Sequence, residues 1–235
     1  MAVITFAHRG ARLEEPENTI PAFRRALGAG VTGLETDVWR AGDGTVVCAH
    51  DPVLRSGLRR VRIAHSSAAK LATVGVPALA DVYGELGTEY ELSVDLKEET
   101  EEAAAALIAV ATEYGALERL WLCAPELELL VNIRARHPTV KLVHSTYKGL
   151  IPTTLERHAS DLANAHIDVL NLHRTEWTAG LVSLVHRFDV LAFGWDAQEA
   201  RHLRALLAMG IDAVYCDHPD RMVATVAEFR ADPAD

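Results

Sequence analysis

Eight short runs rich in valine, isoleucine and leucine alternate along this chain with longer segments of helical periodicity. The runs span residues 3–8, 33–38, 91–96, 119–123, 141–145, 169–173, 190–195 and 213–217. Such an alternation predicts a parallel sheet, and eight strand–helix units are the number that closes a (β/α)8 barrel. An open, doubly wound sheet is the alternative, but no glycine-rich phosphate loop follows the first run. Because no linker or low-complexity stretch divides the chain, we expect one α/β barrel domain over residues 1–235.

The charge and the cysteine content restrict the partners and the compartment. A formal net charge of −10 disfavours nucleic acid, whose phosphates require a basic face, but it allows a small anionic ligand. Cys48, Cys123 and Cys216 are widely spaced, which predicts buried free thiols and fits the reducing cytoplasm. No basic and apolar leader precedes His8, and no apolar stretch is long enough for stable membrane insertion. We therefore expect a cytoplasmic protein; its oligomeric state is left open by the sequence.

The second unit contains an additional hairpin. A Gly-Asp-Gly turn at residues 42–44 separates the run 33–38 from an alternating run at residues 45–49. This pattern predicts a β-hairpin whose second arm returns His50 and Asp51 to the mouth of the barrel. The following segment, residues 52–75, is polar, basic and irregular, and it is expected to form either a lid beside the site or a solvated surface.

Charged residues stand at the strand ends where such a barrel binds its ligands. Arg9 follows the first run, Glu35 and Asp37 share one face of the second, and Asp95 and Lys97 share one face of the third. Three converging carboxylates repel one another unless a cation joins them, and oxygen ligands suit one divalent cation, Mg²⁺ or Ca²⁺. The alternative is a salt-bridge network in which the carboxylates pair with Arg9 and Lys97.

Two of the 11 histidines, His8 and His50, each follow a strand-like run and adjoin other charged residues. Two imidazoles on either side of a phosphodiester can divide the proton transfers, one removing a proton from the nucleophile and the other protonating the leaving oxygen. Arg9, Lys97 and a metal would offset the phosphoryl charge. His65, His137, His158, His186 and His202 lie in polar or helical contexts and are expected to have no catalytic role.

These residues occur in a longer pattern that resembles the glycerophosphodiester phosphodiesterase family, of the phospholipase C-like phosphodiesterase superfamily. The pattern comprises His8-Arg9-Gly10, Pro16-Glu17-Asn18-Thr19, Ala22-Phe23, Ala26, Gly30, Glu35-Thr36-Asp37-Val38, Asp43-Gly44, Val46-Val47 and His50-Asp51. A sparser likeness continues through Val76-Pro77-Ala78-Leu79, Asp95-Leu96-Lys97, Gly194-Trp195, Gly210-Ile211-Asp212-Ala213, Asp217 and Pro219. The likeness therefore spans nearly the whole chain.

The resemblance implies a (β/α)8 barrel that uses a divalent cation to hydrolyse a glycerophosphodiester to sn-glycerol 3-phosphate and an alcohol. It implies the following roles: His8 and His50 as the acid–base pair, Glu35 and Asp37 as metal ligands with Asp95 as the third, Arg9 and Lys97 as phosphate-binding cations, Glu17 and Asn18 beside the metal and substrate, and Trp195 beside the glycerol or the leaving group.

Asp95 is a departure from the family, which usually has Glu at this position. An Asp followed two residues later by Lys also resembles the sphingomyelinase D branch, which forms cyclic phosphates by internal transphosphorylation but lacks the Pro-Glu-Asn-Thr signature. Two alternatives therefore accompany hydrolysis: a lysophospholipase D- or sphingomyelinase D-like transphosphorylation, and a non-catalytic protein that binds a phosphate ligand. Tyr147, His173 and Trp177 lie in loops that could contact the leaving alcohol or serve packing alone.

Overall fold

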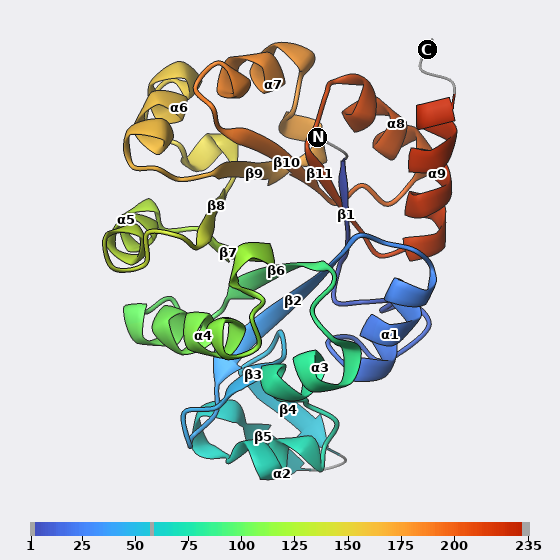
Figure 1. The fold of residues 1–235 in the computed structure, drawn as a ribbon, viewed down its shortest axis with the longest axis vertical. Coiled ribbons are helices and arrows are strands. Elements are labelled where there is room, and N and C mark those ends of the chain that lie inside the picture. Colours follow the sequence, from blue (N-terminus) through green and yellow to red (C-terminus); the bar gives the residue numbers. More distant parts are fainter. Residues whose placement is uncertain (1–2, 57–58, 232–235) are drawn as a thin grey trace.

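The structure, a computed structural model, describes residues 3–56 and 59–231 and contains a closed barrel of eight parallel strands (Figure 1). The strands are β1 (Ile4–Ala7), β2 (Gly33–Arg40), β6 (Glu91–Leu96), β7 (Leu120–Ala124), β8 (Lys141–Ser145), β9 (Val169–His173), β10 (Leu191–Trp195) and β11 (Ala213–Cys216). β1 pairs with both β2 and β11, and this double pairing closes the sheet. The predicted (β/α)8 barrel is thus confirmed, and the predicted strand bounds agree to within two residues at each end.

Helices surround the barrel (Figure 1). They are α1 (Ile20–Gly28), α3 (Leu79–Leu86), α4 (Glu101–Glu113), α5 (Leu127–Arg136), α6 (Leu155–Asn164), α7 (Ala179–His186), α8 (Ala200–Ala208) and α9 (Pro219–Ala231). The side chains of Thr19, Thr100, Thr154 and Thr178 each accept a hydrogen bond from the backbone N–H three residues on, so threonine N-caps fix where four helices begin. The cap at Thr100 sets the start of α4 at Glu101. No described helix is long and apolar enough to cross a membrane.

Apolar side chains form two layers around the strands. The larger layer lies between the sheet and the helices, while a smaller cluster that includes Phe6, Trp121, Phe193 and Tyr215 fills the inside of the barrel. The ring of Phe6 stacks on Tyr215 at a centroid distance of 4.9 Å. This aromatic plug is the floor on which the polar groups at the carboxyl ends of the strands stand.

The predicted hairpin is present, and it extends above the rim of the barrel. β2 continues past its last parallel pair with β6, at Val38, and its end pairs antiparallel with β3 (Val46–Cys48). The chain then forms a second hairpin, β4 (Val53–Ser56) and β5 (Arg59–Arg62), the 3-10 helix η1 (Ile63–His65) and the short helix α2 (Ala68–Ala72). We call residues 41–76 the rim module.

The rim module differs from the expected irregular lid. It has an apolar core of its own, to which Val47, Val61, Ile63 and Leu71 contribute. Its β4–β5 hairpin was not predicted, because arginines interrupt the apolar alternation of Leu54 and Val61. Among its described residues after Pro52, none lines the large cavity of the barrel mouth, so this segment stands beside that cavity and leaves it uncovered.

Candidate active site

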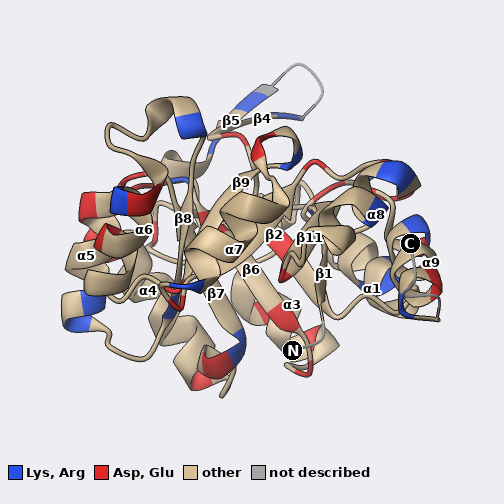
Figure 2. Ribbon diagram, turned by 90° about the horizontal axis from the view of Figure 1, so that it is seen from above, with Lys and Arg blue, Asp and Glu red and all other residues tan. Residues whose placement is uncertain are grey.

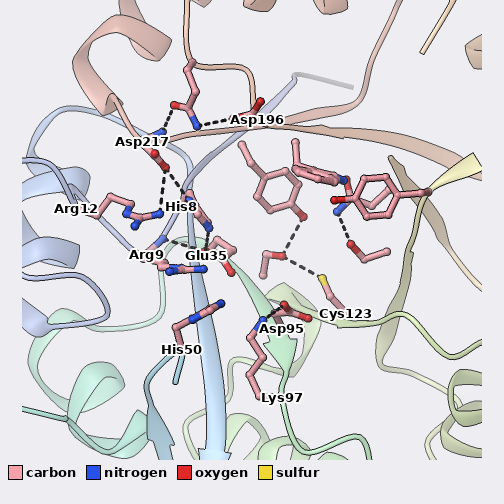
Figure 3. A pocket seen from close by; sticks show the side chains of 17 residues that line it. His8, Arg9, Arg12, Glu35, His50, Asp95, Lys97, Cys123, Asp196 and Asp217 are labelled. Carbon is pink, nitrogen blue, oxygen red and sulfur yellow. Dashed lines mark hydrogen bonds and ion pairs between the residues drawn. The ribbon is translucent and has the colours of Figure 1, made fainter. Parts of the chain in front are cut away.

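A cavity of about 590 Å³ opens at the carboxyl ends of the barrel strands (Figure 3). Seven of the predicted site residues line it: His8, Arg9, Glu35, His50, Asp95, Lys97 and Trp195. The structure thus brings together residues that are up to 187 positions apart in the sequence. Glu17, Asn18 and Asp37 do not line the cavity and lie behind its wall.

His8 stands where β1 meets β11, and the barrel closure determines its partner. Its backbone N–H donates to the Cys216 carbonyl at 3.1 Å, which places the next residue of that strand, Asp217, beside the ring. His8 Nδ1 lies 2.6 Å from Asp217 Oδ1, while Nε2 lies 3.9 Å from Glu35 Oε2. One ring nitrogen is therefore held by a carboxylate, and the other is directed to the cavity, which is the arrangement needed for proton transfer.

The pKa of His8 is set by opposing effects. Burial lowers it, but the negative charges of Glu35 and Asp217 outweigh burial, so the pKa lies above its ordinary value. Burial alone would raise the pKa of Asp217, but the hydrogen bond to His8 and the positive charges of His8 and Arg12 lower it. Asp217 consequently remains ionised against the imidazole.

The turn after β1 directs the backbone N–H of Arg9 to Glu35 and the side chain of Arg9 to Asp37. Arg9 has φ 55° and Gly10 has φ 78°, and the Arg9 N–H donates to Glu35 Oε2 at 2.9 Å. A Cβ on Gly10 would lie 2.7 Å from the backbone carbon of Ala22 at the start of α1, so only glycine fits here. This close approach accounts for the glycine of the His-Arg-Gly run.

Asp37 is the centre of a buried ion-pair network. Its carboxylate lies 2.9 Å from Arg9 Nε and 3.0 Å from Lys97 Nζ, and Asn18 Nδ2 donates to it at 3.1 Å. Burial would raise the pKa of Asp37, but Lys97 and Arg9 outweigh it and lower the pKa. The salt-bridge alternative for the carboxylates therefore describes Asp37. Asn18 and Asp37 lie behind the two cations of the cavity wall and hold them in place.

Asn18 and Glu17 support the wall in different ways. Asn18 is buried with φ 57°, and Thr36 Oγ1 donates to its Oδ1 at 2.8 Å, so its side chain is held on both sides. Glu17 lies 3.0 Å from Arg9 and 2.7 Å from Arg12. It thereby links two guanidinium groups that line the cavity.

Of the three predicted metal ligands, Glu35 alone forms no ion pair with a lysine or arginine in the described structure. Burial, followed by the charges of Asp37 and Asp95, raises its pKa to about 7 against the lowering effect of His8. Asp95, whose carboxylate lies 2.6 Å from Lys97 Nζ, shares the cavity wall with Glu35.

These oxygen donors fit a hard divalent cation in chemistry, and a cation here would relieve the repulsion at Glu35. Among the described residues, no group of three or more His, Cys, Asp or Glu side chains is arranged so that it could hold a metal ion without moving. Asp37 has both oxygens in ion pairs, and it would have to release one in order to bind a metal.

His50 reaches the cavity from the rim module. In Figure 3, Arg9 and Glu35 are drawn between His8 and His50. His50 Nδ1 lies 2.8 Å from Asp51 Oδ1, and Trp39 Nε1 donates to the His50 carbonyl at 3.1 Å. The bond from Trp39 anchors the backbone of His50 at the end of the hairpin. The imidazole is therefore held at the rim, where it is half-exposed.

Aromatic side chains also line the cavity. Trp195 contacts Tyr147 edge-on at a centroid distance of 5.3 Å and His173 at 4.6 Å. Tyr147 lines the cavity, whereas Trp177 is buried and donates to the Phe193 carbonyl, so its role is packing.

Sequence reasoning missed several lining residues. Arg12 gave no signal beyond its place four residues after His8. Asp217 was noted at a strand end, but its contact with His8 depends on the β1–β11 register. The other missed residues are Ser93, Cys123, Ser145, Asn171, Gln198 and Tyr215.

A sequence profile of the glycerophosphoryl diester phosphodiesterase family matches residues 8–221. The chain belongs to this family. The predicted family and enzyme class, a phosphoric diester hydrolase, are thus confirmed at the level of the family. A glycerophosphodiester phosphodiesterase of Bacillus altitudinis is 24% identical over 258 residues, which cover 96% of this chain and 98% of the relative.

Solved structures of glycerophosphodiester phosphodiesterases have the same fold. The enzyme of Thermotoga maritima superposes with a TM-score of 0.81 at 22% identity, covering 95% of this chain and 98% of that one. A phosphodiesterase of Oleispira antarctica, solved in complex with the product sn-glycerol-3-phosphate, has a TM-score of 0.81 at 22% identity and covers 96% of this chain and 97% of its own.

Proposed function

We propose that this chain hydrolyses glycerophosphodiesters to sn-glycerol 3-phosphate and an alcohol, with His8 and His50 as the acid–base pair. The observation that carries the proposal is the cavity that places both imidazoles around Arg9 and Lys97, in a member of this family. The product complex of the Oleispira antarctica relative supports glycerol 3-phosphate as the product class.

In this proposal the phosphate of the substrate lies against Arg9 and Lys97, which Asp37 holds in position. Guanidinium and ammonium groups stabilise the phosphoryl charge as it shifts to the departing oxygen. One imidazole takes a proton from the attacking hydroxyl or water, and the other gives a proton to the alcohol as its bond to phosphorus breaks. Trp195 contacts the glycerol or the leaving group.

Glu35 and Asp95, with Asp37 if it gives up one ion pair, would hold one divalent cation, Mg²⁺ or Ca²⁺. When bound, the cation would supply a positive charge for a non-bridging phosphate oxygen. Glu35 supports this assignment best, because a buried carboxylate beside two others is stabilised by a cation.

The test is release of glycerol 3-phosphate from glycerophosphocholine, glycerophosphoethanolamine and glycerophosphoglycerol with Mg²⁺, Ca²⁺, Mn²⁺ or EDTA. His8→Ala and His50→Ala should each lower kcat by about 100-fold or more. His65→Ala is the matched control, because His65 is exposed in the rim module and does not line the cavity. Full activity of either His8→Ala or His50→Ala would remove that histidine from the proposed role.

Phosphorus NMR of the products distinguishes hydrolysis from the two alternatives. A cyclic diester would show internal transphosphorylation, and the Asp95-x-Lys97 pair is the observation that keeps this reaction in view. Binding of glycerophosphodiesters without any turnover, with each metal present, would instead show a non-catalytic phosphate-binding protein.

A further inference from the structure

The outer face of the β4–β5 hairpin carries a cluster of arginines. The strands pair so that Arg55 lies opposite Arg60, and Val53 lies opposite Arg62. Since alternate residues share a face, the three arginines project on one side, while Leu54 and Val61 project toward the core of the rim module. Arg55, Arg60 and Arg62 are all exposed.

This cluster has no internal compensation in the described structure. Like charges directly opposite each other in a hairpin are destabilising. Several exposed arginines elsewhere have carboxylate partners, such as Arg24 with Glu85 and Arg119 with Glu89. Among the described residues no carboxylate forms an ion pair with Arg55, Arg60 or Arg62. We call the side of the hairpin that carries Arg55, Arg60 and Arg62 the arginine face. An anionic partner would stabilise it by offsetting the repulsion between these charges.

The charge of the rim module contrasts with that of the whole chain. Residues 41–76 contain five Lys and Arg residues against two Asp and no Glu, although the chain has a net charge of −10. Figure 2 shows the β4–β5 hairpin as a basic projection beyond the rest of the molecule. Because the basic charge is concentrated there, an anionic surface would approach this end of the barrel first.

Exposed apolar side chains lie at the same end. Six large apolar residues are exposed in the described chain, and four of them, Leu13, Val53, Tyr147 and Leu150, stand on segments that follow the carboxyl ends of strands. Leu150 is 71% exposed and Leu13 is 59% exposed, and each costs free energy in water. Tyr147 also lines the cavity, so the apolar positions border its mouth.

We propose that this end of the barrel docks on a bilayer containing anionic phospholipid, with the arginine face against the headgroups and Leu13, Val53 and Leu150 in the interfacial region. Exposed apolar side chains at the same end of the barrel as the cations favour a bilayer over nucleic acid, because the phosphate backbone of nucleic acid engages the cations alone. The docking is peripheral and directs the cavity mouth to the lipid surface. It is independent of the hydrolysis proposed above.

Flotation with phosphatidylcholine vesicles and with vesicles of equal parts phosphatidylcholine and phosphatidylglycerol tests the proposal without any activity measurement. The protein should float with the anionic vesicles at low salt and dissociate as salt screens the headgroups. Arg55→Gln/Arg60→Gln/Arg62→Gln should weaken binding by about 100-fold, since each arginine near an anionic surface contributes about a factor of five.

The matched control is Arg119→Gln/Arg187→Gln/Arg230→Gln, which makes the same change in net charge just before β7 and at the carboxyl ends of α7 and α9, away from the docking end of the barrel. It should float as well as the unchanged protein, and circular dichroism with a thermal melt checks that both triple variants are folded. Leu13→Ser/Leu150→Ser should weaken flotation while leaving its salt dependence intact.

Four results would overturn the proposal. These are failure of the unchanged protein to float, equal flotation of the two triple variants, equal flotation with neutral vesicles, and flotation unaffected by Leu13→Ser/Leu150→Ser. Duplex DNA provides the remaining comparison: arginine-dependent binding to DNA without vesicle binding would assign the arginine face to nucleic acid instead.

Discussion

The contact between His8 and Asp217 shows how one hydrogen bond can determine the chemistry of an imidazole. With Nδ1 directed to a carboxylate 2.6 Å away, the ring holds its proton on that side and leaves Nε2 toward the cavity. The main chain that carries this carboxylate is itself fixed, because the backbone N–H of Asp217 donates to Gln198 Oε1 at 2.8 Å. Orientation and tautomer of His8 therefore depend on Asp217.

Asp217→Asn should lower kcat by about 100-fold with little change in KM, because the amide can present an N–H to Nδ1 and favour the wrong tautomer. Steady-state kinetics on a glycerophosphodiester measure the effect. Asp220→Asn is the control, since Asp220 pairs with Arg25 on the surface close by in sequence. A raised KM with unchanged kcat would show that Asp217 acts on substrate binding instead.

Glu35→Gln should separate metal binding from folding. The amide keeps the shape but removes a buried charge near two other carboxylates, so the metal-free variant should be more stable by about 1–2 kcal/mol. In the unchanged protein Mg²⁺ or Mn²⁺ should raise Tm, and in Glu35→Gln this rise should vanish. Thermal melts with and without metal provide the measurement; an equal rise in both proteins would exclude Glu35 as a ligand.

At the scale of elements, the turn that joins β1 to the loop before α1 is the most constrained connection near the site. Gly10 combines a positive φ with a backbone contact to Ala22, whereas Gly44, at the tip of the β2–β3 hairpin, has φ 85° and no atom within 4 Å of an added Cβ. The two glycines therefore separate the effect of backbone conformation from the effect of close packing.

Gly10→Ala should reduce the free energy of unfolding by about 3 kcal/mol, of which about 1 kcal/mol comes from the positive φ and the rest from the clash with α1. Gly44→Ala should reduce it by about 1 kcal/mol only. Urea denaturation of both variants gives the comparison. Equal losses would mean that the chain around Gly10 and Ala22 can relax.

The strands and most of the helices could be predicted because their apolar periodicity is local. The β4–β5 hairpin could not, since its apolar face has only Leu54 and Val61 and its other face is arginine. At the site, alternation correctly placed Glu35 and Asp37 on one face of β2. It could not show that Arg9 and Lys97 would cover Asp37 and leave Glu35 on the cavity, because that depends on side chains that follow β1 and β6.

At the scale of the whole molecule, a buried histidine pair between β8 and α6 makes stability depend on pH. His144 Nδ1 lies 3.1 Å from His158 Nε2, and His144 Nε2 lies 3.0 Å from the Pro125 carbonyl. Burial, then the neighbouring His158, lowers the pKa of His144 to about 4, and burial lowers the pKa of His158. The folded state therefore holds both rings neutral.

Because folding lowers both pKa values, the unfolded chain binds more protons than the folded protein as the pH falls. Stability should fall as the pH drops from about 6.5 toward 4, by about 3 kcal/mol from His144 alone. Urea denaturation across this range, compared with His158→Gln, measures the effect, and the variant should show the shallower decline. Ring titration of His144 near pH 6.5 by NMR would contradict the prediction.

Because β2 extends beyond the barrel rim, the two proposed catalytic histidines lie on parts of the molecule that differ in stability against local unfolding. His8 belongs to the barrel wall, whereas His50 ends a hairpin held by the small core of the rim module. Small apolar cores open more readily than large ones. Warming should therefore abolish turnover while the barrel is still folded, so that the temperature limit of catalysis is set by the module that carries His50.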